Sequence, residues 1–374
     1  MKIPFNKPLI LNDEFENLKK VFENDRFSGN GDFSKKCNKI LENKTGCSKS
    51  IVTSSCTDAL EMTSLLTMIS PGDEVIMPSF TFVSTASAFE LRKAKIVWCD
   101  IRYDTKNIDE NKIEELITPK TKAIVVVHYA GVACEMDRIK EICIKHGIYL
   151  IEDAAQSIDC YYKGQHLGSI GDLGTLSFHE TKNIHCGEGG ALLVNNPSMV
   201  EKAEFIRDKG TNRSHFNQGK VDKYTWHELG SSYLMSELQA AFLYSQLKVS
   251  EEINENRLKS WRLYYDLLLK TLPKEQLPHI PEECIHNAHM FYVLANDEKE
   301  REELLKHLAD NDINAIFHYI PLHEAPYWKG KYSNIHLSIT EKVSKTIIRL
   351  PLFYKIKKSE ILHIVDTLER FYKK

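Results

Sequence analysis

Three groups of residues in the sequence carry side chains that could bind or transform a small molecule. The first spans residues 53–58, Thr-Ser-Ser-Cys-Thr-Asp, between a β-branched run and a stretch rich in Ala, Leu and Met. Free N–H groups at the start of a helix, with Ser and Thr hydroxyls beside them, suit an anion such as a phosphate. A simple Ser or Thr helix cap would explain the same residues.

The second group spans residues 152–156, Glu-Asp-Ala-Ala-Gln, at the end of an apolar strand candidate. A carboxylate at the carboxyl end of a parallel strand lies where open α/β sheets bind ligands. Because a buried carboxylate without a partner is costly, a cationic ring nitrogen or a Lys or Arg is expected opposite it. The alternative is a helix cap for the segment that follows.

The third group spans residues 177–183, Ser-Phe-His-Glu-Thr-Lys-Asn, and is followed by Gly-Glu-Gly-Gly at 187–190. A lysine held near other cations, or away from water, loses pKa and becomes a nucleophilic amine. An ordinary solvated loop lysine is the simpler interpretation. The glycines match neither G-x-G-x-x-G nor a Walker A motif, which argues against a dinucleotide or nucleoside-triphosphate fold.

Taken together, the three groups predict a pyridoxal phosphate site. This cofactor requires a phosphate cradle, an acid for its ring nitrogen and a lysine for its aldehyde, and it then acts as an electron sink. Asp153 precedes Lys182 by 29 residues. That order and spacing are those of fold-type I enzymes of this cofactor.

Ordered motifs along nearly the whole chain resemble the DegT/StrS family of sugar aminotransferases. The motifs are Gly-Asn-Gly at 29–31, Ser-Cys-Thr at 55–57, Pro-Ser-Phe-Thr-Phe-Val-Ser-Thr at 78–85, the second and third groups above, Met-Ser-Glu-Leu-Gln-Ala-Ala at 235–241 and Leu-Pro-Leu at 350–352. The resemblance implies a fold-type I architecture, with a mostly parallel sheet in a large domain and a smaller C-terminal α/β domain.

The resemblance also implies roles for single residues. Lys182 would be the Schiff-base lysine and proton shuttle, and Asp153 would hold the ring nitrogen protonated. The other expected cofactor-binding residues are Phe82 stacking on the ring, Gln156 at its phenolic oxygen, and Cys56, Thr57, Ser177 and Ser232 at the phosphate. Ser232 stands where family members use an Asn from a second subunit, and Cys56 stands where they use Gly. A homodimer with shared active sites is therefore expected.

Further motifs are similar to the branch that acts on dTDP-4-keto-6-deoxyhexoses. They lie at residues 127–137, 210–214, 221–226 and 317–323. The closest members make dTDP-4-amino-4,6-dideoxygalactose for lipopolysaccharide and O-antigen, with glutamate as amino donor. Arg213, Lys223, His318 and Tyr319 are the expected substrate-binding residues. Cationic donors suit a diphosphate, although each of the first three could equally be a solvated charge.

Three other functions stay open on the sequence. An aminotransferase for a 3-keto-6-deoxyhexose is the nearest, because no motif decides how the sugar is posed. A sugar dehydratase of the same family carries His where Lys182 stands, and a cofactor-binding regulator is possible because fold does not dictate function. The sequence does not determine the stereochemistry of the amine, or the roles of His185 and Cys186.

The elements that must position these residues follow from periodicity. Strand candidates at 51–54, 74–77, 95–100, 122–128, 149–152, 175–178 and 191–194 alternate with helix candidates at 59–69, 84–92, 109–117 and 137–146, a pattern typical of a mostly parallel sheet. A capping box at Ser236 and Gln239 opens a predicted long helix that ends near Leu269. The last hundred residues mix strands at 290–294 and 315–318 with helices at 301–310 and 359–372. We therefore expect a large domain at 1–250 and a small domain at 251–374.

Composition excludes several classes. The 374 residues are 42% hydrophobic, with a net charge of −3, which gives no general field for nucleic acid or an anionic membrane. No apolar run approaches the ~20 residues that span a bilayer, and no secretion signal is visible. Nine scattered cysteines without a Cys-x-x-Cys pair favour reduced thiols in a cytoplasmic protein. No metal-ligand spacing stands out, and His286 and His289 lack a nearby carboxylate, so no metal is expected.

Overall fold

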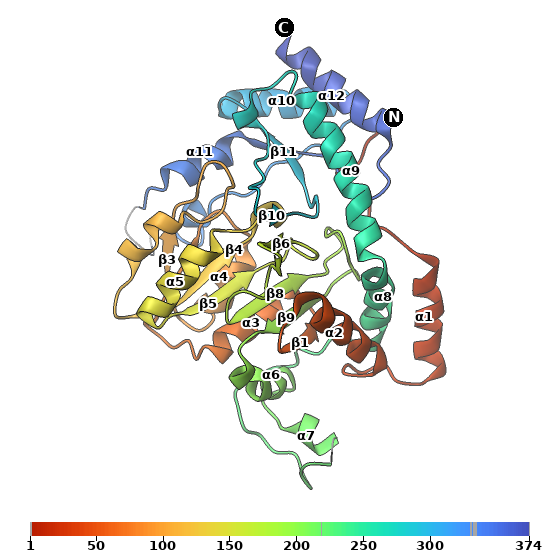
Figure 1. The fold of residues 1–374 in the computed structure, drawn as a ribbon, viewed down its shortest axis with the longest axis vertical. Coiled ribbons are helices and arrows are strands. Elements are labelled where there is room, and N and C mark those ends of the chain that lie inside the picture. Colours follow the sequence, from red (N-terminus) through yellow and green to blue (C-terminus); the bar gives the residue numbers. More distant parts are fainter. Residues whose placement is uncertain (1, 218, 330, 332–334, 374) are drawn as a thin grey trace.

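A seven-stranded sheet forms the centre of the molecule in the computed structural model, which describes residues 2–217, 219–329, 331 and 335–373. The strand order is β1-β9-β8-β5-β4-β2-β3 (Figure 1). The strands are β1 (Lys49–Thr53), β2 (Glu74–Pro78), β3 (Lys95–Cys99), β4 (Thr121–Val127), β5 (Tyr149–Asp153), β8 (Leu173–Ser177) and β9 (Gly190–Val194). Only β9 runs antiparallel to its neighbours in this sheet, which confirms the mostly parallel sheet predicted from the sequence.

Helices cover both faces of the sheet, because successive side chains of each strand point to opposite sides. In β4, Ile124 and Val126 join one apolar cluster, and Ala123 and Val125 join the other. The first cluster includes α2 (Asp32–Thr45), α5 (Met136–His146) and α8 (Glu237–Lys248). The second includes α3 (Cys56–Leu66), α4 (Val83–Glu90) and α6 (Val200–Arg207). The continuous apolar run of β4 is thus explained by burial on both faces.

A third apolar cluster lies at the end of the molecule that carries the C-terminus (Figure 1). It packs α9 (Ser250–Leu268), α10 (Glu298–Asp310) and α12 (Lys358–Tyr372) against the two-stranded sheet of β11 (Phe291–Leu294) and β12 (Ile347–Leu350). Ile3 is fully buried in this cluster, so the N-terminal segment also contributes to it. The division into domains at residue 250 stays a prediction.

The remaining elements connect these layers. The other helices are α1 (Asn12–Glu23), α7 (Arg213–Asn217) and α11 (Ser338–Thr346), and the short strands are β6 (Tyr161–Tyr162), β7 (Gln165–His166) and β10 (Cys284–Ile285). Single 3-10 turns lie at Tyr129–Gly131, Pro197–Met199, Lys274–Gln276 and Leu322–Glu324. None of the described helices combines the length and apolar character needed to cross a bilayer.

Three predicted elements differ in the structure. The long helix after Ser236 is two helices, because Val249 leaves helical geometry with φ −118° and ψ 16°. Helix α8 packs in the first apolar cluster, and α9 runs from that cluster, through Ile253, into the third. Its capping box is confirmed: the Ser236 hydroxyl accepts from the Gln239 N–H at 3.3 Å. The helix predicted at 109–117 is two 3-10 turns at Glu110–Lys112 and Glu114–Leu116. The strand predicted at 315–318 pairs only through a single bridge from Ile316.

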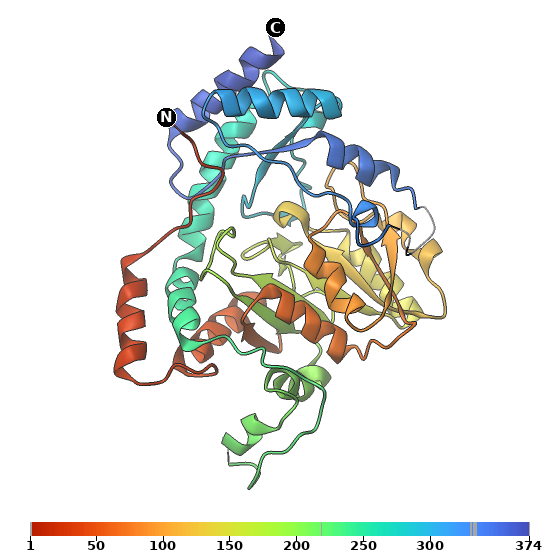
Figure 2. The ribbon, with the colours of Figure 1, turned by 180° about the vertical axis from the view of Figure 1, so that it is seen from behind.

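Residues 208–217 and 219–232 form a projecting segment. In both views it extends away from the sheet beyond α6, carrying α7 (Figures 1 and 2). An antiparallel bridge between Asp208 and Ser232 closes its base. Several large apolar side chains on it are exposed, namely Phe216, Tyr224, Trp226 and Leu229.

Candidate active site

A cavity of about 580 Å³ lies where the carboxyl ends of the central strands face residues of the C-terminal third of the chain, namely His289, Ile316, His318, Tyr319 and Arg349. Nine of the predicted site residues line it: Cys56, Thr57, Phe82, Asp153, Gln156, Ser177, Lys182, His318 and Tyr319. Asp153 and Lys182 therefore face one and the same cavity. The structure brings together side chains from four strand ends and from the C-terminal third of the chain.

One end of the cavity is built to hold an anion. Helix α3 begins at Cys56, and its cap is Ser55, whose hydroxyl accepts from the Asp58 N–H at 3.0 Å. The Thr57 hydroxyl lies 2.7 Å from that of Ser84. A Cβ at Gly190 would lie 2.4 Å from the Cys56 nitrogen, so only glycine lets β9 pass this close to the helix start. Hydroxyls and free N–H groups thus converge at the positive end of an 11-residue helix, as a phosphate requires.

Asp153 ends β5 and presents its carboxylate to the cavity. It accepts hydrogen bonds from the Thr85 hydroxyl at 2.7 Å and from the Ala155 N–H at 3.2 Å. Burial raises the pKa of this carboxyl, and the two hydrogen bonds and the charge of Lys182 act against burial. A cation placed against the carboxylate would favour the ionised form, which is the role expected opposite a ring nitrogen.

Lys182 lies in the turn that follows β8, where its N–H donates to the His179 carbonyl at 2.9 Å. Burial lowers the pKa of its amine, and Asp153 acts against that effect. Its Nζ makes no hydrogen bond or ion pair with any residue that the structure describes. An amine of lowered pKa with no partner is available as a nucleophile.

Aromatic side chains form one wall. Phe82 precedes α4 and is 57% exposed although it lines the cavity, so its ring face is free to stack. The Tyr319 ring lies 6.5 Å from it, and its hydroxyl accepts from Gln156 Nε2 at 3.1 Å. Gln156 Oε1 accepts in turn from the Ala130 N–H at 2.7 Å. The Gln156 amide is therefore held at both ends beside the predicted ring position.

Arg349 in β12 is a cavity residue that the sequence analysis missed. It is 8% exposed, and its Nη1 lies 2.8 Å from His318 Nε2, while its Nε has no hydrogen-bond partner among the described residues. Burial lowers its pKa, yet a guanidinium stays charged in proteins. No carboxylate pairs with it in the described part of the chain, so an anionic ligand group is expected there. The feature of the sequence that could have indicated Arg349 is its charge inside the otherwise apolar run at 347–353.

His318 is neutral in this position. Burial, followed by the charges of Arg349 and Lys182, lowers the pKa of its imidazole to about 2. The ring therefore accepts a hydrogen bond from Arg349 and does not itself supply a cation. Its role toward a substrate stays a prediction.

Arg213, Lys223 and Ser232 do not line the cavity of their own chain. All three are exposed, in the projecting segment or at its base. A role for them in a site of this kind requires a second chain. His185 and Cys186 also lie outside the cavity lining, and both are buried: His185 donates to the Leu9 carbonyl at 2.7 Å, and the Cys186 thiol contacts the Glu188 carbonyl at 3.3 Å.

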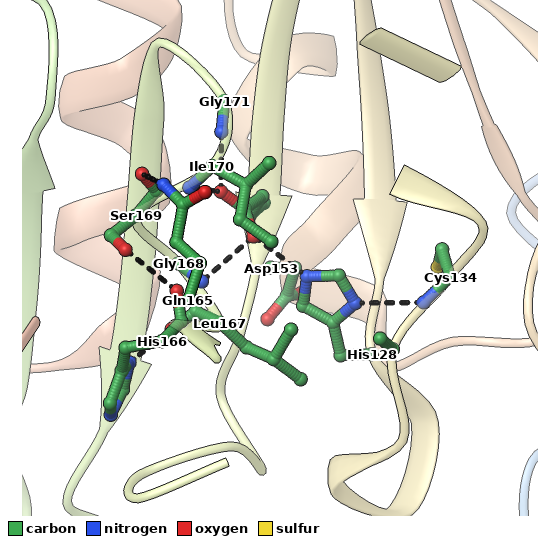
Figure 3. Close-up of polar contacts among 12 residues, drawn as sticks. His128, Cys134, Asp153, Gln165, His166, Leu167, Gly168, Ser169, Ile170 and Gly171 are labelled. Atoms are coloured by element: carbon green, nitrogen blue, oxygen red, sulfur yellow. Dashed lines mark hydrogen bonds and ion pairs between the residues drawn. The ribbon is translucent and has the colours of Figure 1, made fainter. Parts of the chain in front are cut away.

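Glu152, the neighbour of Asp153, points away from the cavity and is fully buried. Its carboxylate accepts from the His128 ring at 2.9 Å and from three backbone N–H groups of one loop, those of Gly168 at 2.8 Å and of Ile170 and Gly171 at 2.6 Å each (Figure 3). These bonds lower its pKa against the effect of burial. The loop is therefore fixed to the strand that carries Asp153.

The same contacts fix the proton of His128. Its Nδ1 accepts from the Cys134 N–H at 3.2 Å, so the proton of the neutral ring lies on Nε2 and is donated to Glu152 (Figure 3). The His128 N–H also donates to the Asp153 carbonyl at 3.2 Å. The network braces the end of β5 directly behind the Asp153 carboxylate.

We expect Glu152→Gln to destabilise the fold by about 3 kcal/mol, because an amide nitrogen would face buried N–H donors. The pKa of Glu152 lies below its ordinary value of 4.5, so the ionised carboxylate stabilises the fold above that pH and the effect is lost as pH falls. Urea unfolding at a series of pH values measures the loss of stability and its pH dependence. Glu16→Gln, at an exposed position of α1, should change neither the stability nor its pH dependence. Equal stability of Glu152→Gln and the parent would contradict the stabilising role of the Glu152 carboxylate.

Comparison with known proteins agrees with this geometry. A sequence model of the DegT/DnrJ/EryC1/StrS aminotransferase family matches residues 8–369. An uncharacterised protein of Methanocaldococcus jannaschii, MJ1066, is 32% identical over 348 residues, which cover 90% of this chain and 89% of that protein.

Solved structures share the fold over the whole chain. DesV of S. venezuelae is 26% identical with a TM-score of 0.91, covering 100% of this chain and 99% of its own. The PLP form of Spr1654 from Streptococcus pneumoniae has 24% identity and a TM-score of 0.91, with the same coverage. The helix start, the buried acid, the unpaired amine and the exposed ring of the cavity fit that cofactor. The chain therefore belongs to the DegT/DnrJ/EryC1/StrS aminotransferase family, which uses pyridoxal phosphate.

Proposed function

We propose that the chain transfers the amino group of glutamate to the 4-keto carbon of a dTDP-4-keto-6-deoxyhexose. The product would be a dTDP-4-amino-4,6-dideoxyhexose, with the galacto isomer favoured, for surface polysaccharide. One observation supports aminotransferase activity above all. The Lys182 amine, which has no partner among the described residues, faces the same cavity as the buried Asp153 carboxylate. The choice of sugar rests on the sequence motifs at 127–137, 210–214, 221–226 and 317–323.

Each residue has a defined task in this proposal. Pyridoxal phosphate, when bound, supplies an aldehyde carbon and an electron-withdrawing ring. The start of α3 with Thr57 and Ser177 would hold the phosphate, Asp153 would keep the ring nitrogen charged, and Phe82 would cover one ring face. Lys182 would hold the cofactor and, once the donor's amine takes its place, would move the proton from the donor's α-carbon. Donor and acceptor use the site in turn, so the kinetics should be ping-pong.

Arg349 would bind a carboxylate of the amino donor. It lies on the wall formed by the C-terminal third of the chain, and its charge is not neutralised by any described residue. The guanidinium fork matches a carboxylate in two parallel hydrogen bonds. A carboxylate docked there would leave the donor's amine free to reach the cofactor.

We expect Arg349→Gln to raise KM for glutamate about 10- to 100-fold, the loss of a hydrogen bond to a charged group. Arg349→Lys keeps the charge without the fork and should give an intermediate KM. Half-reaction kinetics with glutamate measure the KM of both variants. Arg262→Gln on the exposed face of α9 is the matched control. An unchanged KM in Arg349→Gln would contradict this assignment.

The projecting segment would complete the site of a second chain. Arg213 and Lys223 are exposed on it, and cations of this kind suit the diphosphate of a nucleotide sugar. Ser232 would add to the partner's phosphate site. The exposed apolar side chains Phe216, Tyr224 and Trp226 favour burial against another surface, as in a homodimer with shared active sites.

NMR analysis of the product tests the proposed substrate. The holoenzyme is given glutamate and either dTDP-4-keto-6-deoxyhexose or its 3-keto isomer. The proposal predicts amination at carbon 4 with axial, galacto stereochemistry. Amination of the 3-keto isomer alone would show the related 3-amino activity, and the absence of any half-reaction with glutamate would contradict the aminotransferase itself.

A further inference from the structure

A histidine from the C-terminal third of the chain faces the cavity beside Lys182 with its proton position fixed. His289 lines the cavity and is 5% exposed. Its Nδ1 lies 3.1 Å from Asn183 Oδ1, and Asn183 directly follows Lys182 in the chain. The two residues therefore connect the lysine turn to the segment that leads into β11.

The orientation of the Asn183 amide follows from its other contacts. Its Nδ2 donates to the Asn287 carbonyl at 2.8 Å and to Asn254 Oδ1 at 2.9 Å. A backbone carbonyl can only accept, so the nitrogen of the amide must face Asn287 and its oxygen must face His289. His289 Nδ1 therefore carries a proton, and Nε2 of the neutral ring is a hydrogen-bond acceptor.

The charges around the ring keep it neutral. Burial, followed by the charges of Lys182, Arg349 and Arg257, lowers the pKa of His289 far below its usual range. Lys182 has the largest effect among these neighbouring groups.

The backbone at His289 is also held in place. Arg257 of α9 donates from Nε to the Ala288 carbonyl at 3.1 Å and from Nη2 to the His289 carbonyl at 2.8 Å. Arg257 is 4% exposed, and Ala288 has a φ of +52°, a conformation that such contacts must maintain. The position of the ring is thus determined from both sides.

Two complementary groups then face one cavity. Lys182 Nζ is a donor, and His289 Nε2 is an acceptor. Neither has a hydrogen-bond partner among the described residues. Buried polar groups in native proteins are normally satisfied, so a group left open at a cavity is available to a partner that arrives during function.

We propose that His289 Nε2 accepts a hydrogen bond from the Lys182 amine whenever that amine is free. This inference rests on the proposed function, in which the donor displaces Lys182 from the cofactor. His289 is then a positioning residue: it holds the displaced amine, with its lone pair directed at the donor's α-carbon, during proton transfer. Asn183 and Arg257 fix the ring that does this.

The test compares His289→Asn with His289→Gln in the holoenzyme. Asparagine keeps a donor for Asn183 Oδ1 but has no acceptor at the Nε2 position, whereas the longer glutamine amide reaches that position. We expect His289→Asn to slow the half-reaction with glutamate about 100-fold, with KM changed less than about threefold. The isotope effect with α-deuterated glutamate should increase, and His289→Gln should restore part of the rate.

His286→Asn is the matched control, since His286 packs on Trp261 at 4.7 Å and does not line the cavity. A parental rate in His289→Asn, or an equal loss of rate and cofactor binding in both His289 variants, would overturn the proposal. If the parent itself fails to react with glutamate, the proposed function fails instead. The two failures are therefore distinguishable.

Histidine ¹⁵N NMR of the labelled protein gives a readout independent of turnover. The signal that disappears in His289→Asn should show a proton on Nδ1 and none on Nε2 between about pH 6 and 9. A proton on Nε2, or a charged ring in that range, would overturn the proposal.

Discussion

Lys182→Ala is expected to abolish covalent binding of pyridoxal phosphate and to reduce the half-reaction with glutamate by about 10⁴-fold or more. The Lys182 amine faces the cavity without a partner among the described residues, and the structure places no second lysine in the described lining. The variant should therefore lose the absorbance band of the lysine-bound cofactor. Spectra of the purified protein, followed by single-turnover kinetics, measure both effects.

Two controls separate chemistry from folding. Lys306→Ala on the exposed face of α10 should behave like the parent. Mixing Lys182→Ala chains with chains that carry Arg213→Ala and Lys223→Ala should restore about a quarter of the parental activity if each site takes residues from two chains of a symmetric dimer. Turnover by Lys182→Ala alone would show that the role assigned to Lys182 is wrong.

Asp153→Asn is expected to reduce the same half-reaction about 1,000-fold, the size of effect seen when a buried electrostatic group is removed from an active site. The amide can still accept from the Thr85 hydroxyl, but it cannot neutralise a charged ring nitrogen. Cofactor should still bind through Lys182. Absorbance spectra as a function of pH and single-turnover rates distinguish loss of charge from loss of binding.

Asp58→Asn is the matched control for that variant. Asp58 lies in the first turn of α3 and does not itself line the cavity; its carboxylate accepts from the Ser54 hydroxyl and its N–H donates to the Ser55 hydroxyl. Its charge should therefore matter little to the ring nitrogen. If Asp153→Asn keeps the parental rate, the ring nitrogen has another partner and the assignment of Asp153 is wrong.

The local pattern of the sequence was sufficient to predict the central sheet and several of the residues that line the cavity. Strand periodicity gave the seven central strands within a few residues, because alternation and apolar runs depend on near neighbours in the chain. The residues after β1, β5 and β8 could be assigned as well, since each follows the end of its own strand. Asp153 and Lys182 meet because those strand ends share one edge of the sheet.

Contacts between distant segments could not be predicted in this way. Arg349 and His289 reach the cavity from the C-terminal third of the chain. Glu152 and Asp153 are adjacent carboxylates, and the sequence does not tell which of the two faces the cavity and which is bonded to His128 on the other side of β5. Val249 divides one predicted helix into two: α8 packs in the first apolar cluster, and α9 runs from that cluster into the third.

The sequence by itself therefore determined which chemical groups the protein carries and the order in which its strands present them. Only the tertiary structure decided that Arg349 lacks a counter-ion among the described residues and that the proton of His289 lies on Nδ1. It also decided that Arg213 and Lys223 lie outside the cavity of their own chain. The physical reason is that charge compensation, proton position and exposure depend on what packs against a group in three dimensions, and those neighbours are far away in the chain.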